Sequence, residues 1–346
     1  MTAAAYQTII SAALGERRDL FLATANRLGA PLGNIEKDFW VCWTLNQLYH
    51  EQPLEGPRLL FKGGTSLSKA YDLIRRFSED IDVTVFRDDL DQPASVEELE
   101  GMSNKKRQAK LNAIRDSCRA YITGPLHIRL SEQVADATGG MGRVEIDEAD
   151  RDGQTLLIWY PAVEAKPADY IKPAVRIESG AKSALDPNAP VRIKPYVADD
   201  VASLDLTVPG VTTIEPGRTF WDKVVIAHGL RNWFVRRGEL RQEGQRVSRH
   251  YYDLHCLLAA SVGTDALAQP DLGADCVRHA RMFFNRPDYD LASAQRGSFA
   301  LSPEPGMIEA LERDYAATRA MIFGPAPAFR DILSSIQEIE ERANGR

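Results

Sequence analysis

The sequence predicts an α/β protein: a small mixed sheet with helices in the first two thirds, and a mostly helical last third. Two observations support this. Five short segments that are apolar or alternate polar and apolar residues, typical of strands, all lie before residue 198. From residue 217 onward, apolar residues recur at helical spacing. We therefore place a boundary at Pro216 and Gly217, between a core at 1–216 and a helical C-terminal domain at 217–346.

The expected elements follow in chain order. Helices are predicted at 5–28 and 33–50, and the strand RLLFKGG at 58–64 ends in two glycines before a helix at 65–77. DIDVTVF at 80–86 alternates like a half-buried strand, and the charged stretch 95–122 is expected to be helical. Further strands are expected at 156–161, 173–179 and 191–197, and further helices at 217–234, 248–260, 307–322 and 327–343.

Composition narrows the class of protein. The 346 residues are 44% hydrophobic and 26% charged, which is an ordinary globular mixture. No stretch approaches the roughly 20 apolar residues of a membrane span, and the N-terminus is typical of an amphipathic helix rather than a signal peptide. Four scattered cysteines without metal-ligand spacing predict reduced thiols in a cytoplasmic protein. A net charge of -7 argues against a globally basic DNA-binding protein.

The stretch FKGGTS at 61–66 predicts an anion site. A strand, a Gly-Gly turn and a helix start let backbone N–H groups approach a phosphate, and Thr65 or Ser66 can add a hydroxyl. The spacing is not that of a P-loop, so Gly63 and Gly64 taken alone favour a plain tight turn.

Two aspartates follow the turn on the next strand. Asp80 and Asp82 point to one face, where two carboxylates repel each other unless a cation neutralises them, while Ile81 and Val83 point to the buried face. Glu178, at the end of another strand, is expected to complete a carboxylate site for Mg²⁺. Three carboxylates beside a phosphate site indicate two-metal phosphoryl or nucleotidyl transfer. A solvated acidic strand face is the alternative.

The chain FKGGTSLSKAYDLIRRFSEDIDV resembles the AbiEii/AbiGii family of toxin nucleotidyltransferases, which includes the MenT toxins. The resemblance extends over most of the chain, through IEKDFWVCWTL, YIKPAVRIESGAKS, TFWDKVVIAH, SRHYYDLHCLL and RDYAATRAMIFG. It implies a polymerase β-like nucleotidyltransferase fold. It also implies a toxin of a toxin–antitoxin or abortive-infection system that uses an NTP with Mg²⁺ or Mn²⁺ and has an antitoxin encoded nearby.

The resemblance also assigns residues. It implies that Lys223 neutralises phosphate charge, and that Arg249 and Asp253 form a fourth motif, although no lysine precedes Asp253 as in the RxKDxxD form. Arg249 and Asp253 are also spaced to pair with each other on one helix face. Glu36, Lys37 and Asp38 are expected only to brace the core. The remaining implied roles are nucleotide binding by Lys62, Gly63, Gly64, Thr65, Ser66 and Ser78, metal binding by Asp80, Asp82 and Glu178, and catalysis by Asp80, Asp82, Lys223 and Asp253.

Ser78 is a further candidate, for control. A phosphate there would add negative charge beside the acids and oppose nucleotide binding.

The acceptor is less closely determined by the sequence. Some members of the family add nucleotides to the 3′ end of tRNA, so an RNA acceptor and a block of translation are implied. Residues 223–256 hold seven basic residues against three acidic ones, with Trp233 and Phe234 between them, and Lys105, Lys106, Arg107 and Lys110 form a second basic cluster. A solvated helix face with buried aromatic residues explains the first stretch equally well. A protein or small-molecule acceptor, or nucleotide binding without turnover, remain the alternatives.

Overall fold

The computed structural model describes residues 2–52, 56–164, 172–241 and 246–346. Its contacts divide the chain into two compact units, which are described separately below. The first contains Met1–Ala70, Phe77–Ala94 and Ser103–Thr213, and the second contains Tyr71–Arg76, Ser95–Met102 and Ile214–Arg346. The predicted single division at Pro216 and Gly217 does not include the two short segments that the second unit takes from the first half of the chain. Tyr170, Ile171 and Glu243, which belong to the motifs and the basic stretch above, lie outside the described residues.

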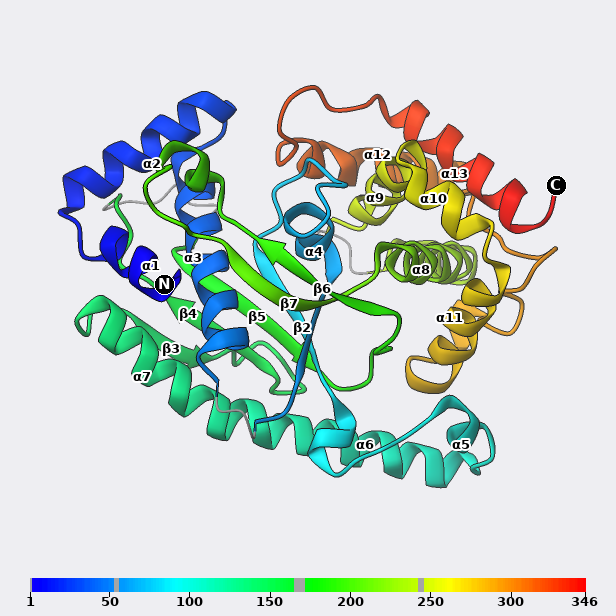
Figure 1. The fold of residues 1–346 in the computed structure, drawn as a ribbon. Helices are drawn as coiled ribbons and strands as arrows, with labels where there is room; N and C mark the ends of the chain where they lie inside the picture. The colour runs from blue at the N-terminus through cyan, green and yellow to red at the C-terminus, as the bar shows by residue number, and fades with distance from the viewer. Residues whose placement is uncertain (1, 53–55, 165–171, 242–245) are drawn as a thin grey trace. The chain divides into compact units, whose positions relative to one another are not determined.

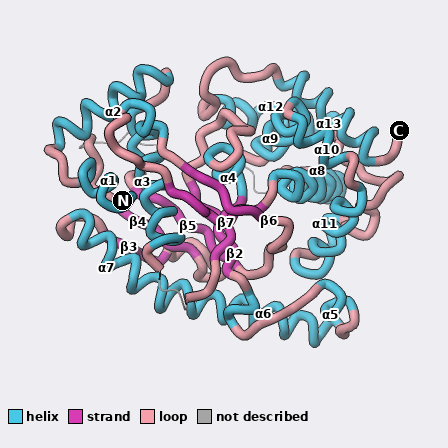
Figure 2. Tube along the Cα trace, in the orientation of Figure 1, coloured by secondary structure: helices cyan, strands magenta, loops and turns pink. Residues whose placement is uncertain are grey.

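A seven-stranded mixed sheet forms the centre of the first unit, and its strands are gathered together in Figure 2. The strand order is β3-β4-β5-β2-β1-β7-β6, so β2 lies between β5 and β1 in the middle of the sheet (Figure 1). β2 runs parallel to β5 and antiparallel to β1, and β1 runs parallel to β7. The strands are β1 (Leu59–Lys62), β2 (Asp80–Val85), β3 (Arg143–Ile146), β4 (Thr155–Trp159), β5 (Ala174–Gly180), β6 (Asn188–Ile193) and β7 (Val208–Ile214).

Helices pack on this sheet. α3 is buried along most of its length and contacts β5, while α4 contacts β1 and β2. The helices of the first unit are α1 (Thr2–Ile10), α2 (Leu14–Leu28), α3 (Leu32–His50), α4 (Gly63–Lys69), α6 (Asn104–Tyr121) and α7 (His127–Thr138), with a π turn at Ile122–Leu126 and 3₁₀ turns at Arg87–Leu90 and Tyr196–Asp200.

The second unit is helical. α8 begins with Pro216 at a position where the missing N–H is not needed, and ends at Arg237, where Gly238 forms a left-handed C-cap with a φ of 72°. α13 buries Phe329, Ile332, Ile336 and Ile339 on one face. Its helices are α5 (Val96–Glu100), α8 (Pro216–Arg237), α9 (Ser248–Ala259), α10 (Ser261–Leu267), α11 (Pro270–Phe283), α12 (Pro305–Arg319) and α13 (Phe329–Ala343), with a 3₁₀ turn at Pro287–Tyr289.

The predicted fold class is confirmed, with corrections to individual elements. The sheet is larger than expected because β3 and β7 were not predicted, and the helix expected at 5–28 is interrupted between α1 and α2. The helix expected at 65–77 ends at Lys69. Asp72 adopts a left-handed conformation with φ of 50°, and Arg76 forms a β-bridge with Ile322, so contacts within the second unit override the helical spacing of this segment.

Candidate active site

Asp80 and Asp82 begin β2 and share one face of the sheet. Both are half-buried, whereas Ile81 and Val83 between them are fully buried on the opposite face, as the alternation predicts. Asp82 lies opposite Lys62 of β1 and opposite Glu178 of β5 in the strand register. Because partners in register point to the same face, these four side chains belong to one polar patch at the middle of the sheet.

The backbone of Gly63 lies directly against Asp82 of this patch. Its φ is 81°, and a Cβ at this position would lie 2.0 Å from Asp82 Oδ2 and 2.7 Å from Asp82 Cγ. The carboxylate of Asp82 therefore occupies the space where any other residue would place its side chain. The glycine turn and the second aspartate are in direct contact, and this contact requires glycine both for its backbone conformation and for its lack of a Cβ.

The hydroxyl groups after the turn are used within the protein. Thr65 is fully buried, and its hydroxyl lies 2.8 Å from Ser78 Oγ and donates to the carbonyl of Asp80. Ser66 is also fully buried and donates to the carbonyl of Gly63 over 2.9 Å. These two residues therefore connect α4 with β2 and close the turn, while Ser78 is half-buried beside Asp80.

The electrostatics of Asp80 indicate a place for a cation. Burial raises the pKa of Asp80, and the neighbouring carboxylates of Glu79 and Asp82 raise it further, against the opposing effects of Lys37 and Arg176. A cation that enters such a site stabilises it, because the positive charge offsets the repulsion between the carboxylates.

Glu178 is engaged with a neighbour on its own strand. Its carboxylate lies 2.7 Å from Arg176 Nη1, and Arg176 also lies 3.2 Å from Asp147. Over the described parts of the chain, no group of three or more His, Cys, Asp or Glu side chains is placed to hold a metal ion. Hard divalent cations favour carboxylate oxygens together with substrate phosphates, and Asp80 and Asp82 are two carboxylates on one face of β2.

Lys223 and Asp253, two of the three residues predicted in the helical part, meet in the second unit. Lys223 Nζ lies 2.8 Å from Asp253 Oδ2, and Arg76 donates two hydrogen bonds of 2.8 Å to the same carboxylate. All three side chains are buried. Burial alone would raise the pKa of Asp253, but Arg76 and Lys223 outweigh it and hold the pKa well below its usual value. Burial lowers the pKa of Lys223, and Asp253 counteracts this.

Arg249 is not the partner of Asp253. It is exposed on α9, while the carboxylate of Asp253 is bound by Arg76 and Lys223. The pairing of Arg249 with Asp253 along one helix face, which the sequence spacing allowed, is therefore wrong. The partners of Asp253 are Arg76, from the segment after α4, and Lys223 of α8.

The basic stretch 223–256 is partly neutralised within the second unit. Arg231 pairs with Glu304, and Arg237 lies 2.6 Å from Asp288. Trp233 is half-buried, stands edge-on to Tyr289, and is approached by the guanidinium groups of Arg237 and Arg241. Trp233 is thus mainly a packing residue. On α6, by contrast, Lys105 and Lys106 are exposed.

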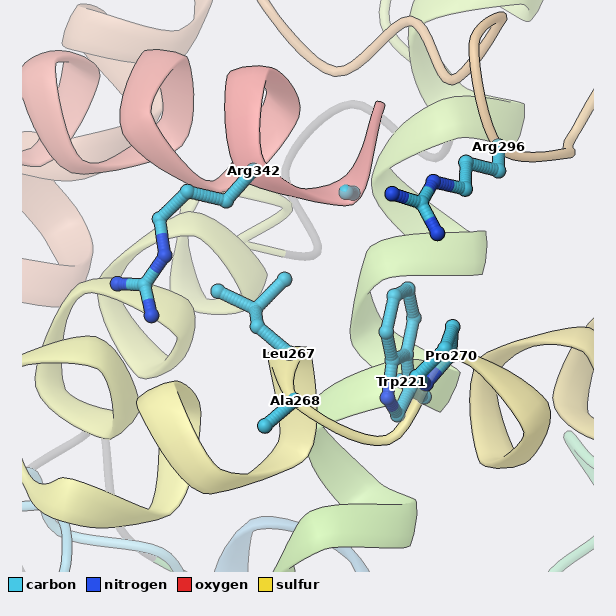
Figure 3. A pocket seen from close by; sticks show the side chains of 7 residues that line it. Trp221, Leu267, Ala268, Pro270, Arg296 and Arg342 are labelled. Carbon is cyan, nitrogen blue, oxygen red and sulfur yellow. The ribbon is translucent and has the colours of Figure 1, made fainter. Parts of the chain in front are cut away.

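Two cavities lie in the second unit, away from the predicted residues. The smaller, of about 260 Å³, is shown in Figure 3, where the side chains of Arg296 and Arg342 lie near Leu267 and Trp221. The larger, of about 540 Å³, is lined by α9 residues, including Tyr252 and His255, and by the loop 325–328. Neither lining includes Lys223, Arg249 or Asp253.

Comparison with known proteins assigns the family. The model of the nucleotidyl transferase AbiEii toxin family, a type IV toxin–antitoxin system, matches residues 47–335. The chain belongs to the AbiEii nucleotidyltransferase toxin family. MenT4, a nucleotidyltransferase toxin (Rv2826c) from Mycobacterium tuberculosis H37Rv, is similar in structure with a TM-score of 0.45 and 14% identity over 93% of this chain and 97% of that one. No curated protein matches.

Membership of the AbiEii family makes the protein a nucleotidyltransferase toxin of a type IV toxin–antitoxin system, with a nucleotide substrate and an antitoxin as partner. Within the described ranges, no helix is long and apolar enough to cross a bilayer.

Several ion pairs near the candidate residues of each unit were not predicted from the sequence. Lys37 and Glu79 pair beside Asp80, and Asp38 pairs with Lys69 at the end of α4. Arg76 binds Asp253. The available signal was the density of charged residues inside otherwise apolar segments, because buried charges need partners.

Proposed function

We propose that this AbiEii-family protein transfers a nucleoside monophosphate from an NTP to the 3′ end of tRNA in the cytoplasm and thereby blocks translation. The observation that carries the catalytic part is the contact between Gly63 and the carboxylate of Asp82, with Asp80 on the same sheet face. This contact supports the proposal because the glycine turn then lies beside two carboxylates of the type that a divalent cation favours.

Asp80 and Asp82 would hold Mg²⁺ or Mn²⁺, and the backbone N–H groups at Gly63 and Gly64 would bind the triphosphate beside Lys62. When bound, the metal neutralises the phosphate charge and acidifies the attacking hydroxyl. The acceptor hydroxyl oxygen forms a bond to the α-phosphorus, the bond from that phosphorus to the bridging oxygen of the β-phosphate breaks, and pyrophosphate leaves. The hydroxyl proton is released to solvent. We also propose that Lys223 and Arg249 counter phosphate charge and that Ser78 lies beside the nucleotide.

The proposal of an RNA acceptor has separate support. Lys105 and Lys106 are adjacent and exposed on α6, which suits contacts to a phosphate backbone. The stretch 223–256 supports it less, because several of its arginines already have partners within the protein.

A labelling assay tests the reaction and the acceptor together. Purified protein is incubated with Mg²⁺, total tRNA and each α-³²P-labelled NTP in turn, beside Asp80→Ala. Asp89→Ala is the matched control, since it removes a carboxylate that pairs with Arg58 at the surface of the same unit. Label on tRNA that disappears in Asp80→Ala and persists in Asp89→Ala supports the proposal. Label that appears on protein instead would mean that the acceptor is a protein and not tRNA. If no pyrophosphate is released with any acceptor, the proposal of catalysis by this site is contradicted.

A further inference from the structure

Three consecutive charged residues are buried in the first half of α3. Glu36, Lys37 and Asp38 are 3%, 4% and 3% exposed. Burying a charge costs several kcal/mol unless it is paired, so each residue needs a partner on another element. Because consecutive residues of a helix point about 100° apart, the three side chains reach three different segments of the first unit.

Asp38 reaches the end of α4. Its carboxylate lies 2.7 Å from Lys69 Nζ and accepts a hydrogen bond of 2.7 Å from the backbone of Tyr196. Both side chains of the ion pair are at most 4% exposed, and Lys69 Nζ also lies 3.6 Å from the centre of the Tyr196 ring. Since Lys69 is the last residue of the helix that begins with Gly63, this pair fixes α4 against α3.

Lys37 reaches the start of β2. Its ammonium group lies 2.6 Å from the carboxylate of Glu79, which immediately precedes Asp80. The same segment is held from the other side, where the Thr65 hydroxyl contacts Ser78 and the carbonyl of Asp80. The contacts therefore close a ring from α3 to α4, from α4 to the start of β2, and back to α3. We call this set the polar ring: Lys37, Asp38, Thr65, Lys69, Ser78 and Glu79.

We propose that Lys37 and Asp38 are positioning residues of the active site, which act by holding α4 and the start of β2 in a fixed relation. The inference rests on the proposed function. The relation has to be exact to within a fraction of an ångström, because Asp82 Oδ2 already occupies the space beside the Gly63 Cα. The ring spans the two segments that make this contact. Lys37 also offsets the negative charge of Glu79, which immediately precedes Asp80.

The test compares Lys37→Met with Glu36→Gln, a neighbour of equal burial on the same helix. Glu36 accepts hydrogen bonds from the backbone of Val163, outside the polar ring, so its substitution measures the general cost of altering α3. Amide hydrogen exchange over 63–66 and 78–82 is measured together with kcat and KM for the NTP. Lys37→Met should accelerate exchange in both segments and lower kcat by about 10- to 100-fold, as the loss of supporting contacts commonly does. Glu36→Gln should change neither.

If Lys37→Met does not fold, the double variant Lys37→Met with Glu79→Gln can be used for the same test. The double variant removes both charges of the pair and so leaves neither without its partner. Its kcat should be no lower than that of the slower of the two single variants, Lys37→Met and Glu79→Gln, since both substitutions break the same contact. Wild-type kcat and unchanged exchange in this folded double variant would overturn the proposal. If the wild-type protein shows no transfer at all, the proposed function fails. The exchange measurement still tests the polar ring, because unchanged exchange over 63–66 and 78–82 in the folded double variant would contradict its positioning role.

Discussion

Replacing Gly63 by alanine tests the geometry of the site directly. The new Cβ would lie 2.0 Å from Asp82 Oδ2, and since an ordinary carbon–oxygen contact is about 3.3 Å or longer, the carboxylate must retreat by about 1.3 Å. A displacement of about 1 Å in a catalytic group costs roughly 100-fold in rate. Alanine at a φ of 81° adds backbone strain, which lowers the free energy of unfolding by about 1–3 kcal/mol.

Gly139→Ala is the matched control. Gly139 has a φ of 60° at the end of α7, in the same unit, and a Cβ there would meet no atom within 4 Å. Both variants should therefore lose stability, measured by urea unfolding, but only Gly63→Ala should lose about 100-fold in kcat for label transfer per folded molecule. A folded Gly63→Ala variant with wild-type kcat would refute the placement of Asp82 at the reacting centre.

Two further predictions concern charge. Asp80→Asn should abolish transfer yet raise the Tm of the metal-free protein, because it removes a carboxylate whose ionised form is disfavoured by burial and by two neighbouring carboxylates. Since the pKa of Asp80 is raised in the metal-free protein, that protein should gain stability from this group on acidification, at a pH above the ordinary aspartate value of about 3.9. The double variant Lys105→Glu with Lys106→Glu should weaken tRNA binding. It should also make the negative slope of log affinity against log salt shallower by about 2.

These predictions have clear contrary outcomes. A lower Tm for metal-free Asp80→Asn would mean that its carboxylate stabilises the fold, and retained transfer would remove it from the metal site. For the lysine pair, Lys194→Glu is the comparison, because Lys194 is exposed but already paired with Asp199. An equal loss of tRNA affinity in that variant would indicate a general effect of charge rather than a binding surface on α6.

The sequence predicted the parts of the site that depend on near neighbours. The alternation in DIDVTV placed Asp80 and Asp82 on one face of β2 and Ile81 and Val83 on the other, since a strand has a period of two. The two glycines after β1 predicted a turn between a strand and a helix, and α4 begins at Gly63, whose φ is 81°. These features need no information from the rest of the chain.

The parts that were not predicted depend on distant residues. The helix expected at 65–77 ends at Lys69, and Arg76 beyond it binds Asp253, which lies 177 residues later in the chain. Glu36, Lys37 and Asp38 were expected to brace the core, but their spacing did not indicate which element each would reach. β7 was not predicted either, because its VPGVTTI sequence contains the proline and glycine that normally argue against a strand.

The contacts of Asp253 favour a supporting role over the catalytic one that the motif implied. A general base needs a pKa near the working pH, whereas Asp253 is fully buried and its pKa is held well below the usual value by two cations. Its contribution to stability is therefore present at neutral pH and is lost only as the pH falls through this low value.

We expect Asp253→Asn to lower the free energy of unfolding by about 3–5 kcal/mol, because Arg76 and Lys223 would remain buried without their carboxylate. If Asp253 acts by keeping Lys223 charged and in place, then Lys223→Met should have the same kcat as the double variant Lys223→Met with Asp253→Asn. Both are measured on folded protein at low temperature. A double variant that is much slower than Lys223→Met would instead show that Asp253 acts on the reaction independently of the lysine.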